Sequence, residues 1–214
     1  MWNMNTEIKY TNTFNKPITN QQLNLSEPHH KHFYVDGKLK KIEMYDYFRS
    51  DVELVLYGVE YFLSGNENLN DIINEYVSEN LYHFVVWYNN QTNSFGDQYW
   101  EYNIYTWLAI TVKGKKVFNN ESLLIASCSI NINTGLIDDR RKYFYGDISI
   151  YERLEYEEEF LSVNYDDSDL EEIYVGDDDF ILEEFIDSQY ADVFVWNDHP
   201  YYHSFEPMLP TGPL

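Results

Sequence analysis

The sequence has little cysteine, few basic residues and no long apolar run, and each shortage excludes a class of protein. One cysteine, Cys128, cannot form an internal disulfide, so we expect a buried thiol and a reducing, cytoplasmic location. The longest apolar runs, 107–112 and 123–130, are far shorter than the roughly 20 residues of a membrane helix, and the N-terminus resembles no signal peptide. With 14 Lys and Arg against 37 Asp and Glu, the net charge of −23 excludes a protein that binds phosphates over most of its surface.

What is present favours a folded chain rich in β-structure. Hydrophobic residues make up 44% of the 214 residues and aromatic residues 18%, which is enough to bury a sizeable core. Asp36-Gly37 predicts a two-residue hairpin turn, because Asp-Gly readily adopts the positive φ angles of a type I′ turn. Apolar residues at helical spacing from Leu69 to Val77 predict an amphipathic helix. Aromatic and β-branched residues predict strands over 32–35, 38–45, 53–63, 82–88, 98–112 and 122–131.

These patterns predict an α+β fold. We expect an antiparallel β-sheet of hairpins and meanders packed against one long helix, with an acidic C-terminal α/β segment. Residues 1–146 would form the sheet and helix, and residues 147–198 an acidic segment packed on the same domain. Residues 199–214 contain four prolines and predict an irregular tail.

The negative charge is concentrated in one part of the chain. Residues 147–189 hold seventeen acidic residues and a single base, Arg153, so they carry −16 of the net −23. Apolar residues alternate with these acids, which indicates ordered structure rather than a disordered tail. Ser168-Asp169-Leu170-Glu171 has the form of a helix capping box, and Asp177 to Asp179 precede the apolar residues of a second expected helix.

No catalytic signature is found, and we predict that the chain is not an enzyme. The sequence lacks the GxSxG, GxxxxGK[ST], GxGxxG and HExxH motifs. His29, His30 and His32 cluster, and His199 and His203 lie four residues apart, but zinc requires three or four converging ligands. The aspartate clusters do not have the EF-hand spacing. We therefore predict no cofactor and no metal ligand, and metal binding by the Asp clusters or by His199 and His203 stays an alternative.

The excess of negative charge predicts a basic partner. Solubility requires a net charge of magnitude about 2 to 8 for a small domain, and like charges held together destabilise the folded state. Carboxylates on ordered elements would attract Lys and Arg, accelerate association and disfavour other partners. We therefore expect a basic protein partner, with no direct binding of nucleic acid or membrane.

The hairpin from Phe33 to Glu43 supports this expectation. Its sequence, Phe-Tyr-Val-Asp-Gly-Lys-Leu-Lys-Lys-Ile-Glu, resembles the Tyr-x-Asn/Asp-Gly-Lys-Leu-Lys hairpins of bacterial polymorphic-toxin immunity and antitoxin-like proteins. The resemblance covers about a dozen residues and assigns no site residues, because that class shares no common site. It implies a non-enzymatic inhibitor that binds one cognate toxin, for example a nuclease.

We therefore predict an immunity-type inhibitor that binds its partner through residues 147–187. The tyrosines among the acids would supply aromatic anchors, since a few buried aromatic residues usually carry most of the energy of an interface. The predicted partner-binding residues are Glu155, Glu157, Glu158, Glu159, Asp166, Asp167, Asp169, Glu171, Glu172, Asp177, Asp178, Glu183, Glu184, Asp187, Tyr151, Tyr156, Tyr165 and Tyr174.

Three alternatives stay open from the sequence. The first is a phage-type nucleic-acid mimic that blocks a defence enzyme. The second is a carboxylate-dependent enzyme on carbohydrate or another small substrate, which predicts a concave pocket lined by Trp and Tyr with a carboxyl group of raised pKa. The third is a structural or assembly subunit with a large apolar patch.

Overall fold

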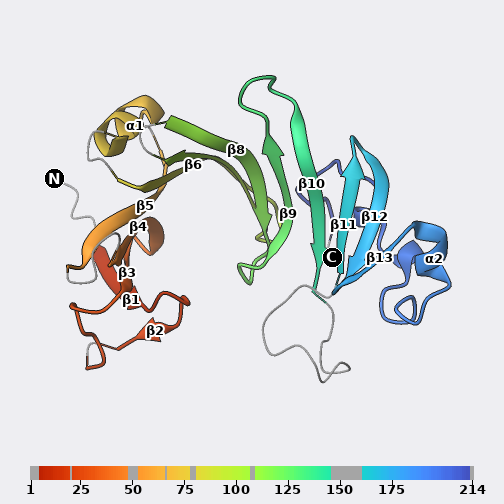
Figure 1. The fold of residues 1–214 in the computed structure, drawn as a ribbon, viewed down its shortest axis with the longest axis horizontal. Helices are drawn as coiled ribbons and strands as arrows, with labels where there is room; N and C mark the ends of the chain where they lie inside the picture. Colours follow the sequence, from red (N-terminus) through yellow and green to blue (C-terminus); the bar gives the residue numbers. More distant parts are fainter. Residues whose placement is uncertain are drawn as a thin grey trace. The chain divides into compact units, whose positions relative to one another are not determined.

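The computed structural model describes residues 5–19, 21–47, 53–65, 67–77, 81–106, 109–145 and 161–212. Thirteen strands in these residues form one sheet, in the order β13-β12-β11-β10-β9-β8-β7-β6-β5-β4-β3-β1-β2 (Figure 1). The strands are β1 Thr6–Thr11, β2 Pro17–Ile18, β3 His29–Val35, β4 Lys38–Asp46, β5 Val55–Phe62, β6 His83–Thr92, β7 Gln98–Thr106, β8 Ala109–Phe118, β9 Leu124–Ile130, β10 Ile137–Phe144, β11 Leu161–Asp166, β12 Asp169–Val175 and β13 Asp178–Phe180. The α-helices among the described residues are α1 Leu69–Val77 and α2 Leu182–Ile186, and the 3₁₀ helices η2 Trp196–Asp198 and η3 Pro200–Tyr202 follow them.

The predicted fold class is wrong. Within the described residues the helices are short, nine residues in α1 and five in α2, so no long helix packs against the sheet. Most of the described chain is strand instead, and the sheet is mixed rather than purely antiparallel. The apolar spacing from Leu69 correctly located a helix, but it extends over only two and a half turns of the chain.

The parallel pairing occurs between β5 and β6, where Gly58 lies opposite His83 and Val59 opposite Phe84. Two strands that follow each other in the chain can be parallel only if the connection crosses over the sheet. The connection that contains α1 makes this crossover. The helix therefore serves a topological purpose, as the link between two runs of antiparallel strands.

The chain divides into two compact units, residues 1–89 with 102–113, and residues 90–101 with 114–214. In the first unit, α1 covers β5 and β6 and buries Tyr76 against Phe84, with ring centroids 5.1 Å apart. Val59 and Val86 complete this core. The apolar face of the helix, which packs against this core, thus consists of Leu69, Ile72, Ile73 and Tyr76.

In the second unit, the core lies between the strands and the C-terminal segment. Alternate residues of β11, Leu161, Val163 and Tyr165, are buried, as are Ile173 and Val175 of β12. The segment expected as an irregular tail, residues 199–214, packs onto this face with Tyr202 and Phe205, and Phe194 just before it joins the same core. The predicted boundary between residues 146 and 147 lies outside the described residues.

Candidate partner-binding surface

Exposed carboxylates surround the end of the sheet formed by β11, β12 and β13, together with α2. We call this set the acidic surface. In β12, Ile173 and Val175 point into the core, so the acids of the hairpin point away from it or lie in its turn. The exposed members are Asp166, Asp167, Asp169, Glu171, Asp177, Asp178, Asp179, Glu183, Glu184 and Asp187, and Glu172 is half-buried.

Little of this charge is neutralised by nearby bases. Among the described residues, one ion pair reaches the acidic surface, between Arg140 Nη2 and Asp167 Oδ1 at 2.9 Å. Glu172 and Asp178 instead accept hydrogen bonds from neutral donors, the hydroxyls of Tyr174 and Tyr190. The acidic surface therefore keeps most of its negative charge.

The predicted tyrosine anchors differ from one another in the structure. Tyr165 is in the core, 4% exposed, and its hydroxyl donates to the carbonyl of Tyr202 at 2.8 Å. Burial also raises its pKa far above the ordinary value. Tyr174 is half-buried on the opposite face beside Glu172. Only Tyr174 of these two can face a partner, because strand alternation turns Tyr165 inward.

Several predicted residues lie outside the described residues, and one acid was missed. Those outside are Tyr151, Glu155, Tyr156, Glu157, Glu158 and Glu159. Asp179 belongs to the acidic surface, since it is exposed in β13 beside Asp178. Its position in the Asp177 to Asp179 run was a signal that could have identified it.

The hairpin of the acidic surface has the same construction as the hairpin at Asp36-Gly37. Each has a two-residue turn with positive φ at its first residue, 48° at Asp36 and 54° at Asp167. In each, one extra residue bulges at the same place in the second strand, Lys40 or Glu171. A tyrosine before the turn pairs with a leucine after it, and an isoleucine follows the bulge: Tyr34, Leu39 and Ile42 in one, Tyr165, Leu170 and Ile173 in the other.

The two hairpins carry opposite charges at matching positions. Lysines in the first are acids in the second: Lys38, Lys40 and Lys41 correspond to Asp169, Glu171 and Glu172. Two lysines of β4 form ion pairs with acids of the first unit. Lys40 binds Glu67, which also accepts from the Tyr61 hydroxyl at 2.7 Å, and Lys41 pairs with Glu43 at 2.7 Å. Two of the three lysines of the basic hairpin are thus paired with acids of their own unit, whereas the acids at the matching positions of the acidic hairpin have no such ion pair in the described residues.

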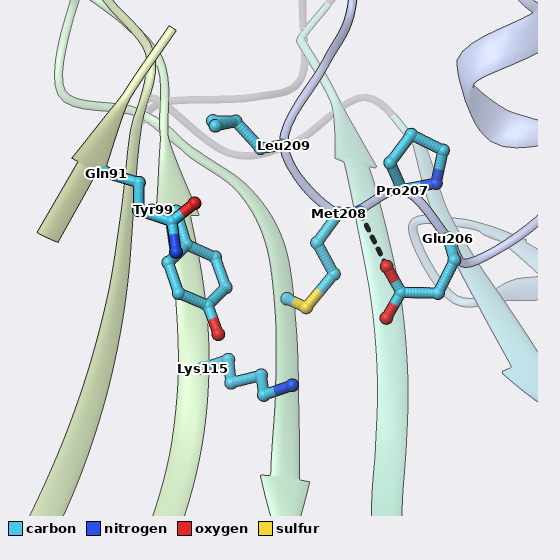
Figure 2. Close-up of a pocket in the computed structure, with 7 residues that line it drawn as sticks. All are labelled: Gln91, Tyr99, Lys115, Glu206, Pro207, Met208 and Leu209. Carbon is cyan, nitrogen blue, oxygen red and sulfur yellow. Dashed lines mark hydrogen bonds between the residues drawn. The ribbon is translucent and has the colours of Figure 1, made fainter. Parts of the chain in front are cut away.

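A small pocket in the second unit lies between the C-terminal segment and the sheet (Figure 2). Its volume is about 210 Å³, below the roughly 300 Å³ at which ligand sites usually begin. Glu206 is the carboxylate among its described lining residues, and it accepts a hydrogen bond from the amide of Met208 at 3.2 Å. The other lining residues are Gln91, Tyr99, Lys115, Pro207, Met208 and Leu209. The pocket therefore has neither the paired carboxylates nor the tryptophans that a glycosidase-like site requires.

Three of the six histidines stack on aromatic rings. His29 stacks on Tyr45 with ring centroids 5.0 Å apart, and His199 stacks on Phe194 at 4.3 Å. His203 stacks on Trp196 and hydrogen-bonds to its carbonyl at 2.8 Å. Burial lowers the pKa of His199. In the part of the chain that the structure describes, no three His, Cys, Asp or Glu side chains are grouped to hold a metal ion.

Cys128 is buried, and burial raises the pKa of its thiol to about 11. At neutral pH the group is a thiol rather than a thiolate, and the thiolate is the nucleophilic form. The geometry therefore favours packing over catalysis for this residue.

Comparisons with known proteins identify no relative. Family models, curated proteins and solved structures all give no match to this chain. The helices of the described residues are all too short or too polar to cross a membrane.

Proposed function

We propose that the protein is a non-enzymatic inhibitor of the immunity type, which binds and neutralises a basic partner protein through the acidic surface. The observation that carries this proposal is the uncompensated charge, because a single ion pair reaches the ten exposed carboxylates of this surface in the described residues. A basic partner would supply the missing cations and would be drawn to the surface over a Debye length of about 8–10 Å at physiological salt. The partner would be a toxin of the same reducing cytoplasm.

The hairpin resemblance supports the same proposal. The motif that resembles immunity and antitoxin-like proteins occurs once in the sequence as Asp-Gly-Lys-Leu-Lys, and its bulged form occurs a second time with acids in place of the lysines. A scaffold of such hairpins lets side-chain charge vary while the backbone register stays fixed. We infer that the acidic hairpin, β11–β12, binds the partner, whereas the basic hairpin of the same construction, β3–β4, stabilises the first unit.

The test is co-purification with the tagged chain from its native host, followed by titration of the identified partner in purified form. We expect a basic protein that is retained at about 50 mM salt and released at about 500 mM, as screening of charge requires. The triple variant Glu171→Gln, Glu183→Gln, Glu184→Gln should weaken binding at least tenfold. A matched control, Glu27→Gln, Asp71→Asn, Glu121→Gln, removes three exposed acids elsewhere and should bind like the unmodified chain.

Two results would contradict the proposal. One is retention of no basic protein at low salt, and the other is equal affinity of both triple variants and the unmodified chain. Competition by DNA or RNA distinguishes the nucleic-acid mimic from the toxin inhibitor, because a mimic occupies its partner's nucleic-acid groove.

A further inference from the structure

Two large apolar side chains are exposed within the acidic surface. Ile181 immediately precedes α2 and Ile186 is its last residue, and each is 51% exposed. Between them, Leu182 and Phe185 pack into the core, with Phe185 fully buried. The helix is therefore anchored to the second unit through Leu182 and Phe185, while its isoleucines and acids stay exposed.

The anchoring of α2 keeps these isoleucines in place. The ring of Phe185 lies 6.1 Å from that of Phe180, which in turn lies 5.8 Å from Tyr190. The amide of Phe185 donates a hydrogen bond to the carbonyl of Ile181 at 2.9 Å, and the hydroxyl of Tyr190 donates one to the carboxylate of Asp178 at 2.9 Å. A prearranged apolar group loses little conformational entropy when a partner covers it.

The acids around the two isoleucines define what could cover them. Glu183, Glu184 and Asp187 are exposed within or next to α2, and Asp177 to Asp179 precede it. Protein interfaces commonly have an apolar centre and a polar rim. A second copy of this chain would bring carboxylates against carboxylates, which disfavours self-association. The complementary occupant is a segment with apolar residues on one side and Lys or Arg around them.

We propose that α2 is the apolar centre of the docking surface, with Ile181 and Ile186 as its contacts, and that it takes a basic amphipathic segment of the partner protein. This rests on the proposed function and adds to it the chemistry of the bound segment. Charge would then bring the partner to the acidic surface, and burial of the isoleucines would distinguish an amphipathic segment from a merely basic one.

The experiment uses two synthetic peptides of 18 residues and identical leucine and lysine composition. In one, the leucines recur at helical spacing, and in the other they are scrambled around the helix. We expect the full chain to bind the amphipathic peptide about tenfold more tightly than the scrambled one. The variant Ile181→Ser, Ile186→Ser should lose this preference while the salt dependence of binding is kept.

A matched control removes two exposed apolar residues from the β9–β10 turn of the same unit. The variant Ile132→Ser, Leu136→Ser should keep the tenfold preference, since these side chains are 41% and 66% exposed but lie outside the acidic surface. Thermal denaturation checks that both variants are folded. The comparison of the two peptides on the unmodified chain does not depend on any variant.

The possible outcomes distinguish a failure of this inference from a failure of the proposed function. Equal, salt-sensitive binding of both peptides overturns the apolar centre and leaves the basic-partner proposal intact. Loss of preference in the control variant also overturns it, as does a self-associated chain that Ile181→Ser, Ile186→Ser converts to a monomer. Binding of neither peptide at low salt counts against the proposed function itself.

Discussion

The ammonium group of Lys142 has three hydrogen-bond donors, and the C-terminal segment offers three carbonyl oxygens to it. The distances from Nζ to the carbonyls of Tyr201, Ser204 and Pro207 are 2.6, 2.8 and 3.1 Å, and the ring of Tyr201 lies 3.6 Å away. The side chain is fully buried in β10. It therefore satisfies main-chain groups that would otherwise be buried without donors.

Substitution of Lys142 by methionine should destabilise the second unit. Methionine keeps much of the volume but leaves the three carbonyls without a donor, so we expect a loss of about 3 kcal/mol in the free energy of unfolding. Urea denaturation measures it. The control Lys115→Met, on the half-buried pocket lysine, should change stability by less than about 1 kcal/mol, and equal losses in the two variants would contradict the assignment.

The same residue makes stability depend on pH. Burial lowers the pKa of Lys142 from its ordinary 10.5 to about 7, although Glu206 opposes this. Between pH 7 and 10.5 the unfolded chain binds the proton more tightly, so stability should rise with pH by at most about 1.4 kcal/mol per unit. From about pH 9 the trend should reverse, because burial raises the pKa of Cys128 to about 11 and also raises that of Tyr165, Tyr201 and Tyr202, so that only the unfolded chain then ionises these groups.

Denaturation at pH 7, 8 and 9 tests this linkage. The rise should be present in the unmodified chain and absent in Lys142→Met. A pH-independent stability in the unmodified chain over this range would show that the amine keeps its ordinary pKa.

The sequence could not predict Lys142 as a core residue. In the run Arg140-Arg141-Lys142, strand alternation places Arg141 on one face of β10 and Lys142 on the other. Because all three residues are basic, the sequence does not indicate which of the two faces is buried. The deciding partners lie about sixty residues further along the chain.

At the level of elements, the residues of a turn predicted its structure correctly only where they strongly favour one backbone conformation. Asp36-Gly37 was correctly predicted as a two-residue turn, and both residues have positive φ. Ser168-Asp169-Leu170-Glu171 was wrongly predicted as a helix start, since Ser168 lies in a hairpin turn and the other three residues begin β12. A capping box and a hairpin turn use the same small polar residues, and only pairing with β11 decides between them.

The turn at Gly37 provides a direct test of this local chemistry. Gly37 has φ of +78°, and a Cβ there would meet no atom within 4 Å. Gly37→Ala should therefore cost about 1 kcal/mol through backbone strain alone. Gly212→Ala, also in open space but without positive φ, should be close to neutral in the same denaturation assay; a similar cost at both positions would refute the strain argument.

For the whole molecule, the charge difference between the units has a consequence for stability. The first unit contains twelve acidic and eight basic residues, and the second twenty-five acidic and six basic. Repulsion among the acids of the second unit opposes its folding at low salt. Binding of a cationic partner would relieve that repulsion.

Replacing acids by lysine should then stabilise the free chain. The basic hairpin shows that lysine fits the positions of Asp169 and Glu171, because Lys38 and Lys40 occupy them in the same register. Asp169→Lys, Glu171→Lys should raise the free energy of unfolding by about 1 kcal/mol at low salt and by much less at about 500 mM. The same variant should bind the partner more weakly, and a loss of stability at low salt would contradict the repulsion.

Whole-molecule topology was the least predictable level. Individual strands and the helix at Leu69 could be located, because their periodicity is local. The parallel pairing of Gly58 with His83 depends on contacts across a connection of twenty residues, which no local pattern encodes. The acidic surface was predicted in part, since exposure of alternate acids follows from strand periodicity once β12 is known.

The carbonyl cage of Lys142 also sets an order of events during synthesis on the ribosome. Its acceptors are translated 59 to 65 residues after the lysine, so β10, β11 and β12 are all synthesised before them. Until then the carbonyl acceptors of this lysine are missing, and only water can accept its hydrogen bonds. Completion of the second unit must therefore wait until residues 201–207 have been synthesised.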